Sequence, residues 1–434
     1  MSDEARQYRE RTPNSGRRFE ESRRYLPGGD SRSTLFYPPY PSVLVQGDGC
    51  RVVDLDGNRL VDFTGNHSIL VHGYGAPPVM EAIRRQLEMG TCFSGPTEVQ
   101  LRFAQHLVQR IGSLEQVRFT NSGTEAVMMA VRAARRFTGR RRIAKLEGGF
   151  HGTSEDVMGS EHADLVVLPA DDAGAAVARL ERNGAEIASL LVEPVQGSAG
   201  MLPLDAGYLR ALREATRQLG IVLLFDEVVS LRVAYGGAEE HFGVRPDMCC
   251  LGKVIGGGLP LGAFGGRREI MTLFDPSHGP PTIPHPGSYN ANPVSLAAGL
   301  ATLELLTRDA VARLNAMGDR LRSGLLGVFA EAGIALSITG LGSLFGIHLT
   351  EGPVRTIRDA VRADADLGHR IFLGLYLEGV LIDPRGVGTI STAIGNAEIE
   401  GFLAAFRTVL SRLRQPGSRD VILRERSDRR ILPA

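Results

Sequence analysis

Two residues suited to carbonyl chemistry lie in one stretch of the chain, residues 221–258. Asp226 follows an apolar run that begins at Ile221, and Lys253 stands between a second apolar run, CCLG, and a glycine-rich turn. Lysine is rarely placed among apolar residues without a partner. Partial desolvation and neighbouring charge would lower its pKa and free its amine to attack an aldehyde carbon. Asp226 could pair with a protonated pyridine nitrogen, although a carboxylate at a strand end also commonly caps a helix.

Two further motifs could hold other parts of one ligand. Ser122-Gly123-Thr124-Glu125 follows a short apolar run and opens a helical pattern, so its backbone N–H groups would suit a phosphate. Taken alone, the same motif describes a capped helix equally well. Phe150 and His151, in GGFHG, could stack on a planar ring and lie beside it, although such residues more often pack in a core. The absence of a GxxxxGK[ST] sequence argues against a nucleotide P-loop.

The elements that would position these residues alternate between short apolar runs and helical patterns from about Glu98 onward. This order predicts βαβ units and an α/β fold whose large domain is a doubly wound, mostly parallel sheet, with ligands at the C-terminal ends of its strands. Strands are predicted at residues 117–119, 142–146, 165–169, 187–192 and 221–225, with a helix at 207–219 and an earlier helix on which Leu101, Ala104, Val108 and Ile111 share one face.

A second, smaller α+β domain is predicted from the two ends of the chain. Residues 43–63 alternate apolar and polar side chains around two Asp-Gly pairs, which is typical of an antiparallel meander. We assign residues 1–68 to the N-terminal segment and meander of this small domain, 69–308 to the large domain, and 309–434 to the C-terminal part of the small domain. The arginine-rich tail from Arg414 is predicted to be a solvated extension.

Composition narrows the classes of function. The 434 residues include 49 Lys and Arg against 49 Asp and Glu, so nothing favours nucleic acid or anionic membranes as partners, and small ligands are the better expectation. The four cysteines form no metal-binding spacing and are interpreted as reduced, buried thiols. The N-terminus lacks an apolar signal segment, and no later run is long enough to span a bilayer. We therefore expect a cytoplasmic protein without a metal.

Several motifs, taken in order, form a pattern that none of them carries alone: PGGDSRS, NSGTEA, GGFHG, VEPVQG, FDEV, LGKVIGGG and GSYNANP. With them the sequence resembles the class III aminotransferases, pyridoxal-phosphate enzymes of fold type I, over nearly the whole chain. Within that family it is most similar to the glutamate-1-semialdehyde aminomutase-like subgroup, and there to the β-amino-acid aminotransferases. The resemblance implies pyridoxal 5′-phosphate as cofactor. It also implies a homodimer, because the family's active site lies between two subunits.

The resemblance also assigns roles to residues. Lys253 would bind the cofactor as a Schiff base and move the proton between the substrate carbon and the cofactor, and Asp226 would bind the pyridine nitrogen. The remaining implied cofactor contacts are Ser122, Gly123 and Thr124 at the phosphate, Phe150 and Val228 on the two ring faces, His151 beside the ring, Glu193 behind these residues, and Ser288, which keeps the hydroxyl of a threonine that the family supplies from the partner subunit.

Two arginines in loops are candidates for binding a substrate carboxylate, Arg32 in GDSRSTLF and Arg385 in IDPRGVGT. Surface arginines are the competing interpretation for both. The resemblance favours function, because both resemble carboxylate-binding positions of the β-amino-acid aminotransferases. The aminomutase pattern, PGG followed by NSPVR, is altered here, and Arg385 has no obvious aminomutase counterpart. The region TGNHSILVHGYG, where other pocket residues would fall, does not indicate which side chain is accepted.

These observations lead to one main hypothesis and several alternatives. The main hypothesis is transfer of an amino group from a β-amino acid or related amine to an α-keto acid such as 2-oxoglutarate or pyruvate. An isomerase that moves an amino group within one molecule, as the aminomutases do, is the first alternative. Racemase or decarboxylase activity on the same scaffold is favoured less. A non-catalytic protein that keeps this fold is also favoured less, because the lysine, the acid and the phosphate turn are all present.

Overall fold

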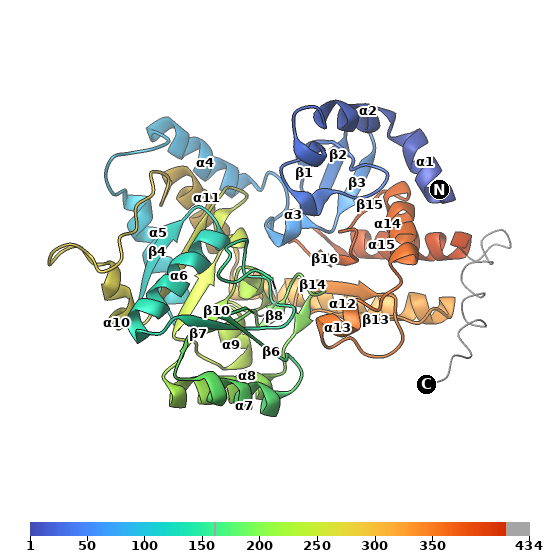
Figure 1. The fold of residues 1–434 in the computed structure, drawn as a ribbon. Helices are drawn as coiled ribbons and strands as arrows, with labels where there is room; N and C mark the ends of the chain where they lie inside the picture. Colours follow the sequence, from blue (N-terminus) through green and yellow to red (C-terminus); the bar gives the residue numbers. More distant parts are fainter. Residues whose placement is uncertain (160–161, 414–434) are drawn as a thin grey trace, which may run out of the picture.

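A seven-stranded sheet forms the centre of the computed structural model, which describes residues 1–159 and 162–413 (Figure 1). The strand order is β4-β12-β11-β10-β7-β5-β6. Strands β11, β10, β7, β5 and β6 pair in parallel, and β12 is antiparallel to both of its neighbours. The strands are β4 (Gln116–Thr120), β5 (Arg142–Leu146), β6 (Leu165–Leu168), β7 (Ile187–Val192), β10 (Val222–Asp226), β11 (Met248–Leu251) and β12 (Gly262–Gly266). The mostly parallel sheet expected from the sequence is confirmed.

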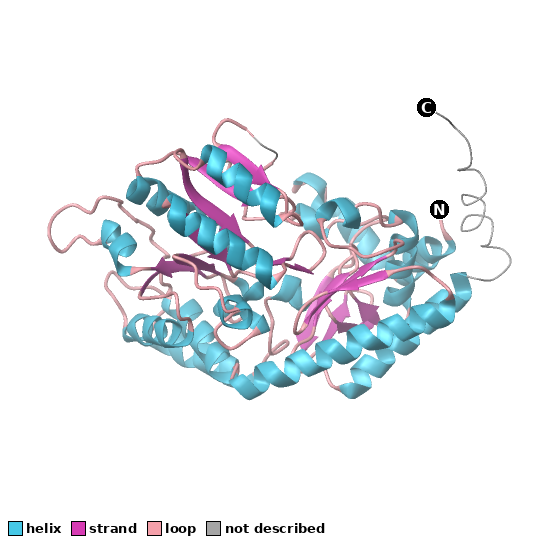
Figure 2. Cartoon of the chain, turned by 90° about the horizontal axis from the view of Figure 1, so that it is seen from below, coloured by secondary structure: helices cyan, strands magenta, loops and turns pink. Residues whose placement is uncertain are grey.

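Helices cover both faces of this sheet (Figure 2). One face packs against α6 (Gly123–Thr138) through Ala126, Ala130 and neighbouring side chains. The other face packs against α7 (Ala173–Asn183) and α8 (Ala206–Leu219). Because neither face meets water, every residue of β7 and β10 is buried, as their continuous apolar runs predict.

Two smaller sheets lie outside the central one, and the first joins the two ends of the chain, where blue and red elements lie together in Figure 1. The meander β1 (Leu44–Asp48), β2 (Arg51–Asp54) and β3 (Arg59–Asp62) is antiparallel, and β3 also pairs in parallel with β15 (Val380–Leu381). A three-stranded sheet joins β13 (Ser337–Thr339), β14 (Leu344–His348) and β16 (Val387–Thr389). The predicted meander is confirmed, and the domain boundaries at residues 68 and 308 stay a prediction.

The remaining elements complete the two bodies. They are α1 (Asp3–Arg11), α2 (Pro13–Ser22), α3 (Gly65–Ser68), α4 (Pro77–Met89), α5 (Glu98–Arg110), α9 (Ala238–Phe242), α10 (Arg268–Met271), α11 (Pro293–Leu305), α12 (Arg308–Ala332), α13 (Ile357–Ala360), α14 (Ala365–Leu377), α15 (Asn396–Leu413), and the small ribbon of β8 (Val195–Gln196) and β9 (Leu202–Pro203). None of the helices in the described ranges combines the length and hydropathy that crossing a membrane requires. The cytoplasmic location stays a prediction, and the tail from Arg414 lies outside the described residues.

The predicted apolar face of α5 is wrong in part. Leu101 is 54% exposed, whereas Ala104 and Val108 pack against the core and Ile111 is buried, as predicted; Phe103 and Leu107, which the prediction left out, are buried as well. Apolar side chains lie on more than one side of α5, so their spacing alone does not identify the buried face. The tertiary contact that decides the face is the stacking of Phe103 on Phe119 of β4, with ring centroids 5.6 Å apart.

Candidate active site

Sequence motifs from five strands meet at one edge of the central sheet. Strand β10 ends at Asp226, which lies beside Cys250 of β11, and Lys253 follows β11 after one glycine. On the other side of β10, Phe225 pairs with Val192, so Glu193 follows β7 at the same edge. Strands β4 and β5 end just before Ser122 and the GGFHG turn. The C-terminal ends of the strands therefore form the site, as expected for this sheet.

A buried acid and histidine lie at the centre of this edge. The Nδ1 atom of His151 is 2.9 Å from Oδ2 of Asp226, and the two residues are only 2% and 4% exposed. A carboxylate oxygen accepts hydrogen bonds, so this contact fits the imidazole form in which Nδ1 carries a proton. The Nε2 atom of His151 is buried without a partner among the described residues. The backbone N–H of Val228 donates to Oδ1 of Asp226 over 3.1 Å.

Glu193 lies behind this pair and connects it to the GGFHG turn. Its Oε2 accepts a hydrogen bond from the backbone N–H of Phe150 at 2.8 Å, and its Oε1 accepts one from Gly197 at 3.3 Å. Burial raises the pKa of Glu193 to about 7, with the Asp226 charge adding to the effect and His151 opposing it. The carboxyl group therefore titrates near neutral pH.

Lys253 is the cation of this group. Burial lowers its pKa; the negative charges of Asp226 and Glu193 oppose the shift, and the positive charge of Arg385 adds to it. A lowered pKa increases the fraction of neutral, nucleophilic amine. Lys253 also has a φ of 47°, in the left-handed region that is strained for a residue with a side chain. We name Asp226, His151, Glu193 and Lys253 the strand-edge group.

The Ser122 turn is both a helix cap and an open helix N-terminus. Ser122 Oγ accepts from the backbone N–H of Glu125 at 3.2 Å, so the capped-helix interpretation of this hydroxyl is confirmed. The N–H groups at the start of α6 have no partner within the helix and remain available to an anion. Two glycines allow the close packing around the turn: a Cβ on Gly262 would collide with the carbonyl oxygen of Ser122, and one on Gly123 would lie 2.8 Å from Val228.

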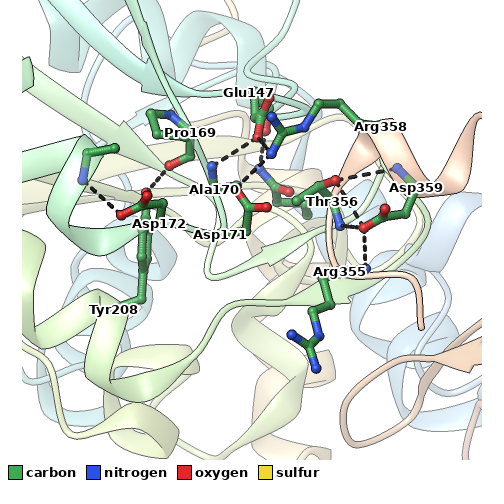
Figure 3. Close-up of polar contacts among 12 residues, drawn as sticks. Glu147, Pro169, Ala170, Asp171, Asp172, Tyr208, Arg355, Thr356, Arg358 and Asp359 are labelled. Carbon is green, nitrogen blue, oxygen red and sulfur yellow. Dashed lines mark hydrogen bonds and ion pairs between the residues drawn. The ribbon is translucent and has the colours of Figure 1, made fainter. Parts of the chain in front are cut away.

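Glu147, the residue before the GGFHG turn, is held by a polar cluster outside the turn (Figure 3). The Nη2 atom of Arg358, on α13, lies 3.0 Å from Oε1 of Glu147 and 2.7 Å from Oδ1 of Asp171. The next residue after Glu147 is Gly148, with a φ of 75°, and a Cβ there would lie 3.0 Å from Cβ of Ile357, also on α13. The turn thus touches the C-terminal part of the chain directly. Phe150 at its tip is 51% exposed.

The two candidate arginines lie in one neighbourhood. Arg32 Nη1 donates to Oδ1 of Asn66 at 2.9 Å. Arg385 donates to both oxygens of Asp383, each over 2.9 Å, and Nδ1 of His67 lies 3.4 Å from Oδ2 of the same carboxylate. Although burial alone would raise the pKa of Asp383, the hydrogen bond from His67 and the hydrogen bonds and charge of Arg385 hold it well below its usual range. We name Arg32, Asn66, His67, Asp383 and Arg385 the arginine group.

A cavity of about 610 Å³ lies beside the arginine group. Arg32, Asn66, His67 and Asp383 line one part of it, and apolar side chains, among them Phe19, Leu35 and Val43, line another. It is therefore suited to a small molecule that carries both a carboxylate and an apolar group.

Ser288 lies apart from these residues of the same chain. It is exposed, in a loop that is tied back to the Ser122 turn through Asn290, whose Oδ1 accepts from Nδ2 of Asn121 at 3.1 Å. Among the interactions of the described residues, Ser288 therefore has no contact with the strand-edge group of its own chain.

Sequence reasoning missed three members of the arginine group, Asn66, His67 and Asp383. Asn66 and His67 lie in TGNHSILVHGYG, which has no residue spacing that signals a site. Asp383 offered a weak signal, since a carboxylate two residues before an arginine in a Pro-containing turn can bond back to it. By contrast, the predicted neighbours Asp226, His151, Glu193 and Lys253 do lie together.

Comparisons with known proteins identify the family. The chain matches the family model described as Aminotransferase class-III over residues 36–167 and 168–407. It is 40% identical to the β-phenylalanine transaminase of Variovorax paradoxus over 414 residues, covering 93% of this chain and 94% of that protein. It is 38% identical to the glutamate-1-semialdehyde 2,1-aminomutase of Methanothermobacter thermautotrophicus over 416 residues, covering 91% and 98%.

A solved structure described as a transaminase with PLP bound is 38% identical to the chain and superimposes with a TM-score of 0.88, covering 93% of this chain and 98% of that one. The chain belongs to the class III aminotransferases and is a transaminase that depends on pyridoxal 5′-phosphate.

Proposed function

We propose that this transaminase takes its amino group from a β-amino acid or a related amine and delivers it to an α-keto acid, 2-oxoglutarate or pyruvate. The observation that carries the proposal is the arginine group: Arg32 contacts Asn66, Arg385 is held by Asp383 next to His67, and Arg32 and Asp383 line one cavity. A β-amino acid has its carboxylate one carbon farther from the reacting carbon than an α-keto acid has. Two guanidinium groups suit carboxylates at two such distances. The β-phenylalanine transaminase among the relatives supports this class of donor.

The residues of the strand-edge group fit the cofactor. A buried carboxylate suits a protonated ring nitrogen, and the unpartnered Nε2 atom of His151 leaves a polar position for a ligand beside it. Val228 forms a wall that Gly123 and Gly252 approach closely, since a Cβ on either would lie 2.8 or 3.3 Å from its methyl groups. The N-terminus of α6, at Gly123 and Thr124, offers N–H groups to the phosphate. Phe150 would cover the other face of the ring.

Lys253 would act at the reacting carbon. Bound pyridoxal phosphate supplies an aldehyde for attachment of the amine and a ring that draws electrons from the bond being broken. The lowered pKa of Lys253 favours the neutral form of its Nζ amine, the form that could take a proton from the substrate carbon. The same atom, once protonated, can return that proton to a neighbouring carbon, which is the transfer that a transaminase requires.

Asp226 would hold the proton on the ring nitrogen. His151 fixes the orientation of its carboxylate through the 2.9 Å contact, and the Val228 N–H fixes the other oxygen. Glu193 in turn positions the GGFHG turn by accepting from Phe150. The three side chains therefore orient the cofactor ring from its nitrogen edge.

A homodimer is part of the proposal, with Ser288 of a second copy completing the phosphate site. Ser288 and the 66% exposed Tyr289 lie next to the segment of Met89 and Phe93, which are 60% and 50% exposed. The two segments are joined by Asn292 Nδ2, which donates to the carbonyl of Thr91 at 2.9 Å. Such a contiguous apolar surface is typical of a subunit interface. Light scattering coupled to gel filtration of the holoenzyme should give twice the chain mass.

Half-reaction spectra test the proposed donor and acceptor. The holoenzyme is mixed with a β-amino acid in the absence of a keto acid, and we expect the visible cofactor band to disappear and one equivalent of β-keto acid to form. Addition of 2-oxoglutarate or pyruvate should restore the band and yield glutamate or alanine. A band unchanged by a panel of β-amino acids, but lost with α-amino acids, would overturn the assignment of the donor.

The alternative of an isomerase is favoured by the aminomutase relatives, which are nearly as similar as the transaminase. An isomerase releases an isomer of its substrate with no acceptor present, whereas a transaminase stops after one half-reaction. Repeated turnover of glutamate-1-semialdehyde by the holoenzyme without a keto acid would therefore favour this alternative over the proposal.

A further inference from the structure

Residues 65–68, the short element labelled α3, form a left-handed turn between the meander and α4. The φ values of Gly65, Asn66, His67 and Ser68 are 50°, 51°, 54° and 70°. Residues with side chains rarely adopt this conformation, and when they do it is usually at single positions. Three such residues in succession are strained and persist only where the surroundings hold them.

Both ends of this turn are held by buried polar groups. At its start, Oδ1 of Asp62 accepts from the backbone N–H groups of Thr64 and Gly65 at 2.6 and 3.3 Å. At its end, Nη1 of Arg232 donates to the carbonyl of Ser68 at 3.2 Å.

Arg232 is fully buried, and within the described part of the chain no carboxylate forms an ion pair with it. Its other donors reach Ser343 Oγ at 2.9 Å and the carbonyl of Ile390. Burial lowers the pKa of this guanidinium to about 9. A buried cation whose donors all go to neutral oxygens is costly. Here the hydrogen bonds of Arg232 to those oxygens connect the left-handed turn to the end of β16 and to the 341–343 loop.

The turn presents adjacent residues to arginines from opposite ends of the chain. Asn66 accepts from Arg32, and His67 contacts Asp383, whose two oxygens hold the guanidinium of Arg385. Because Asn66 and His67 are adjacent, the backbone of the turn links the position of the Arg32 guanidinium to that of the Asp383 carboxylate, which in turn holds Arg385.

We infer that the left-handed turn 65–68 is a bracket that sets the relative positions of the two carboxylate-binding arginines, with Asn66 and His67 as positioning residues and Arg232 as its anchor. This inference rests on the proposed function and deepens it. By fixing where both guanidinium groups lie, the bracket sets the two distances from the reacting carbon at which a carboxylate can be bound, so it determines which amino acids and keto acids the enzyme accepts.

Glycine substitutions test the bracket without forcing a new backbone, because glycine adopts positive φ freely. The probe is 3-phenylpropanoate, which has the carboxylate and ring of a β-amino acid donor but no amine, and its dissociation constant for the holoenzyme is measured by calorimetry. We expect Asn66→Gly and His67→Gly to weaken binding about tenfold each, the loss of roughly one charge-assisted hydrogen bond. The visible cofactor band and the melting temperature should stay at the values of the parent.

His67→Asn is the conservative variant, since asparagine tolerates this backbone and its amide can donate to Asp383. It should bind the probe within threefold of the parent. Unchanged binding in both glycine variants would overturn the inference. Arg32→Lys, measured in parallel, separates failure of the bracket from failure of the proposed function. If it weakens binding while the glycine variants do not, the bracket fails and the proposed function stands. If none of the three weakens binding, the arginine assignment fails as well.

Discussion

The strand-edge group and the arginine group differ in how the chain builds them. Asp226, His151 and Glu193 follow strands of one sheet, are almost fully buried, and hold each other through short contacts. Arg32 and Arg385 come from loops near opposite ends of the chain, and the Arg385 side chain is 48% exposed. The first group is thus positioned by a rigid sheet, which suits chemistry that is common to the whole family. The second depends on loops and a strained turn, which can change without disturbing the sheet.

The largest effect should come from the strand-edge group. Lys253→Ala removes the only side chain proposed both to bind the cofactor and to move the substrate proton, so kcat should fall by ~10³-fold or more. The variant should still bind pyridoxal phosphate, because the acid, the ring wall and the helix N-terminus are unchanged. Turnover is measured with a β-amino acid and 2-oxoglutarate, and cofactor binding by absorbance after gel filtration. Retained turnover above a few per cent would show that another residue moves the proton.

Replacement of Glu193 should give the next largest effect, and this effect is on the stability of the protein. Its pKa is raised from 4.5 in the unfolded chain to about 7 in the folded protein. Between these values the folded protein binds more protons than the unfolded chain, so the free energy of unfolding falls as pH rises, by ~3 kcal/mol over the whole window. Glutamine cannot ionise, and Glu193→Gln should lose this dependence.

The measurement is urea unfolding of the cofactor-free protein at pH 4.5 and pH 8, for the parent and the variant. The stability of Glu193→Gln relative to the parent should rise between the two pH values. Glu20→Gln, at a side chain that is 67% exposed, is a matched control and should follow the parent. Parallel profiles for the parent and Glu193→Gln would contradict the raised pKa.

The arginine group should give smaller effects that depend on the substrate. Arg32→Lys and Arg385→Lys keep the charge but lose the planar fork, so KM for a β-amino acid should rise by roughly 10- to 30-fold, equivalent to about 1.5–2 kcal/mol. A carboxylate-free amine such as 1-phenylethylamine should be affected less than threefold. Steady-state kinetics with both donors checks this. An equal loss with both donors would mean that the arginines act on the fold or the cofactor and not on the carboxylate.

How far the sequence predicts each group follows from the same difference. Asp226, Lys253 and Ser122 lie next to apolar runs and glycines, so local pattern places them at strand ends and the parallel sheet brings those ends together. The arginine group needs the pairing of β3 with β15 and the left-handed turn at Asn66, which are long-range and conformational facts. No local spacing encodes them. The same limit explains why Leu101 on α5 is wrongly predicted to face the core: it is exposed, and the stacking of Phe103 on Phe119 decides the packing.

The smallest effect should come from the polar cluster that holds Glu147, the residue before the GGFHG turn (Figure 3). Arg358 bridges Glu147 and Asp171, but its side chain is 58% exposed, and exposed ion pairs contribute only ~0–1 kcal/mol. Arg358→Gln should therefore raise the dissociation constant of the cofactor by less than about fivefold, and high salt should have a similar effect on the parent. Arg362→Gln is the matched control, since Arg362 pairs with Asp359 and not with Glu147. A much larger rise in the dissociation constant of the cofactor would mean that the GGFHG turn depends on α13 as strongly as the buried acid depends on the sheet. In that case α13 would belong with the sheet as a part that positions the strand-edge group, and not with the adaptable loops around it.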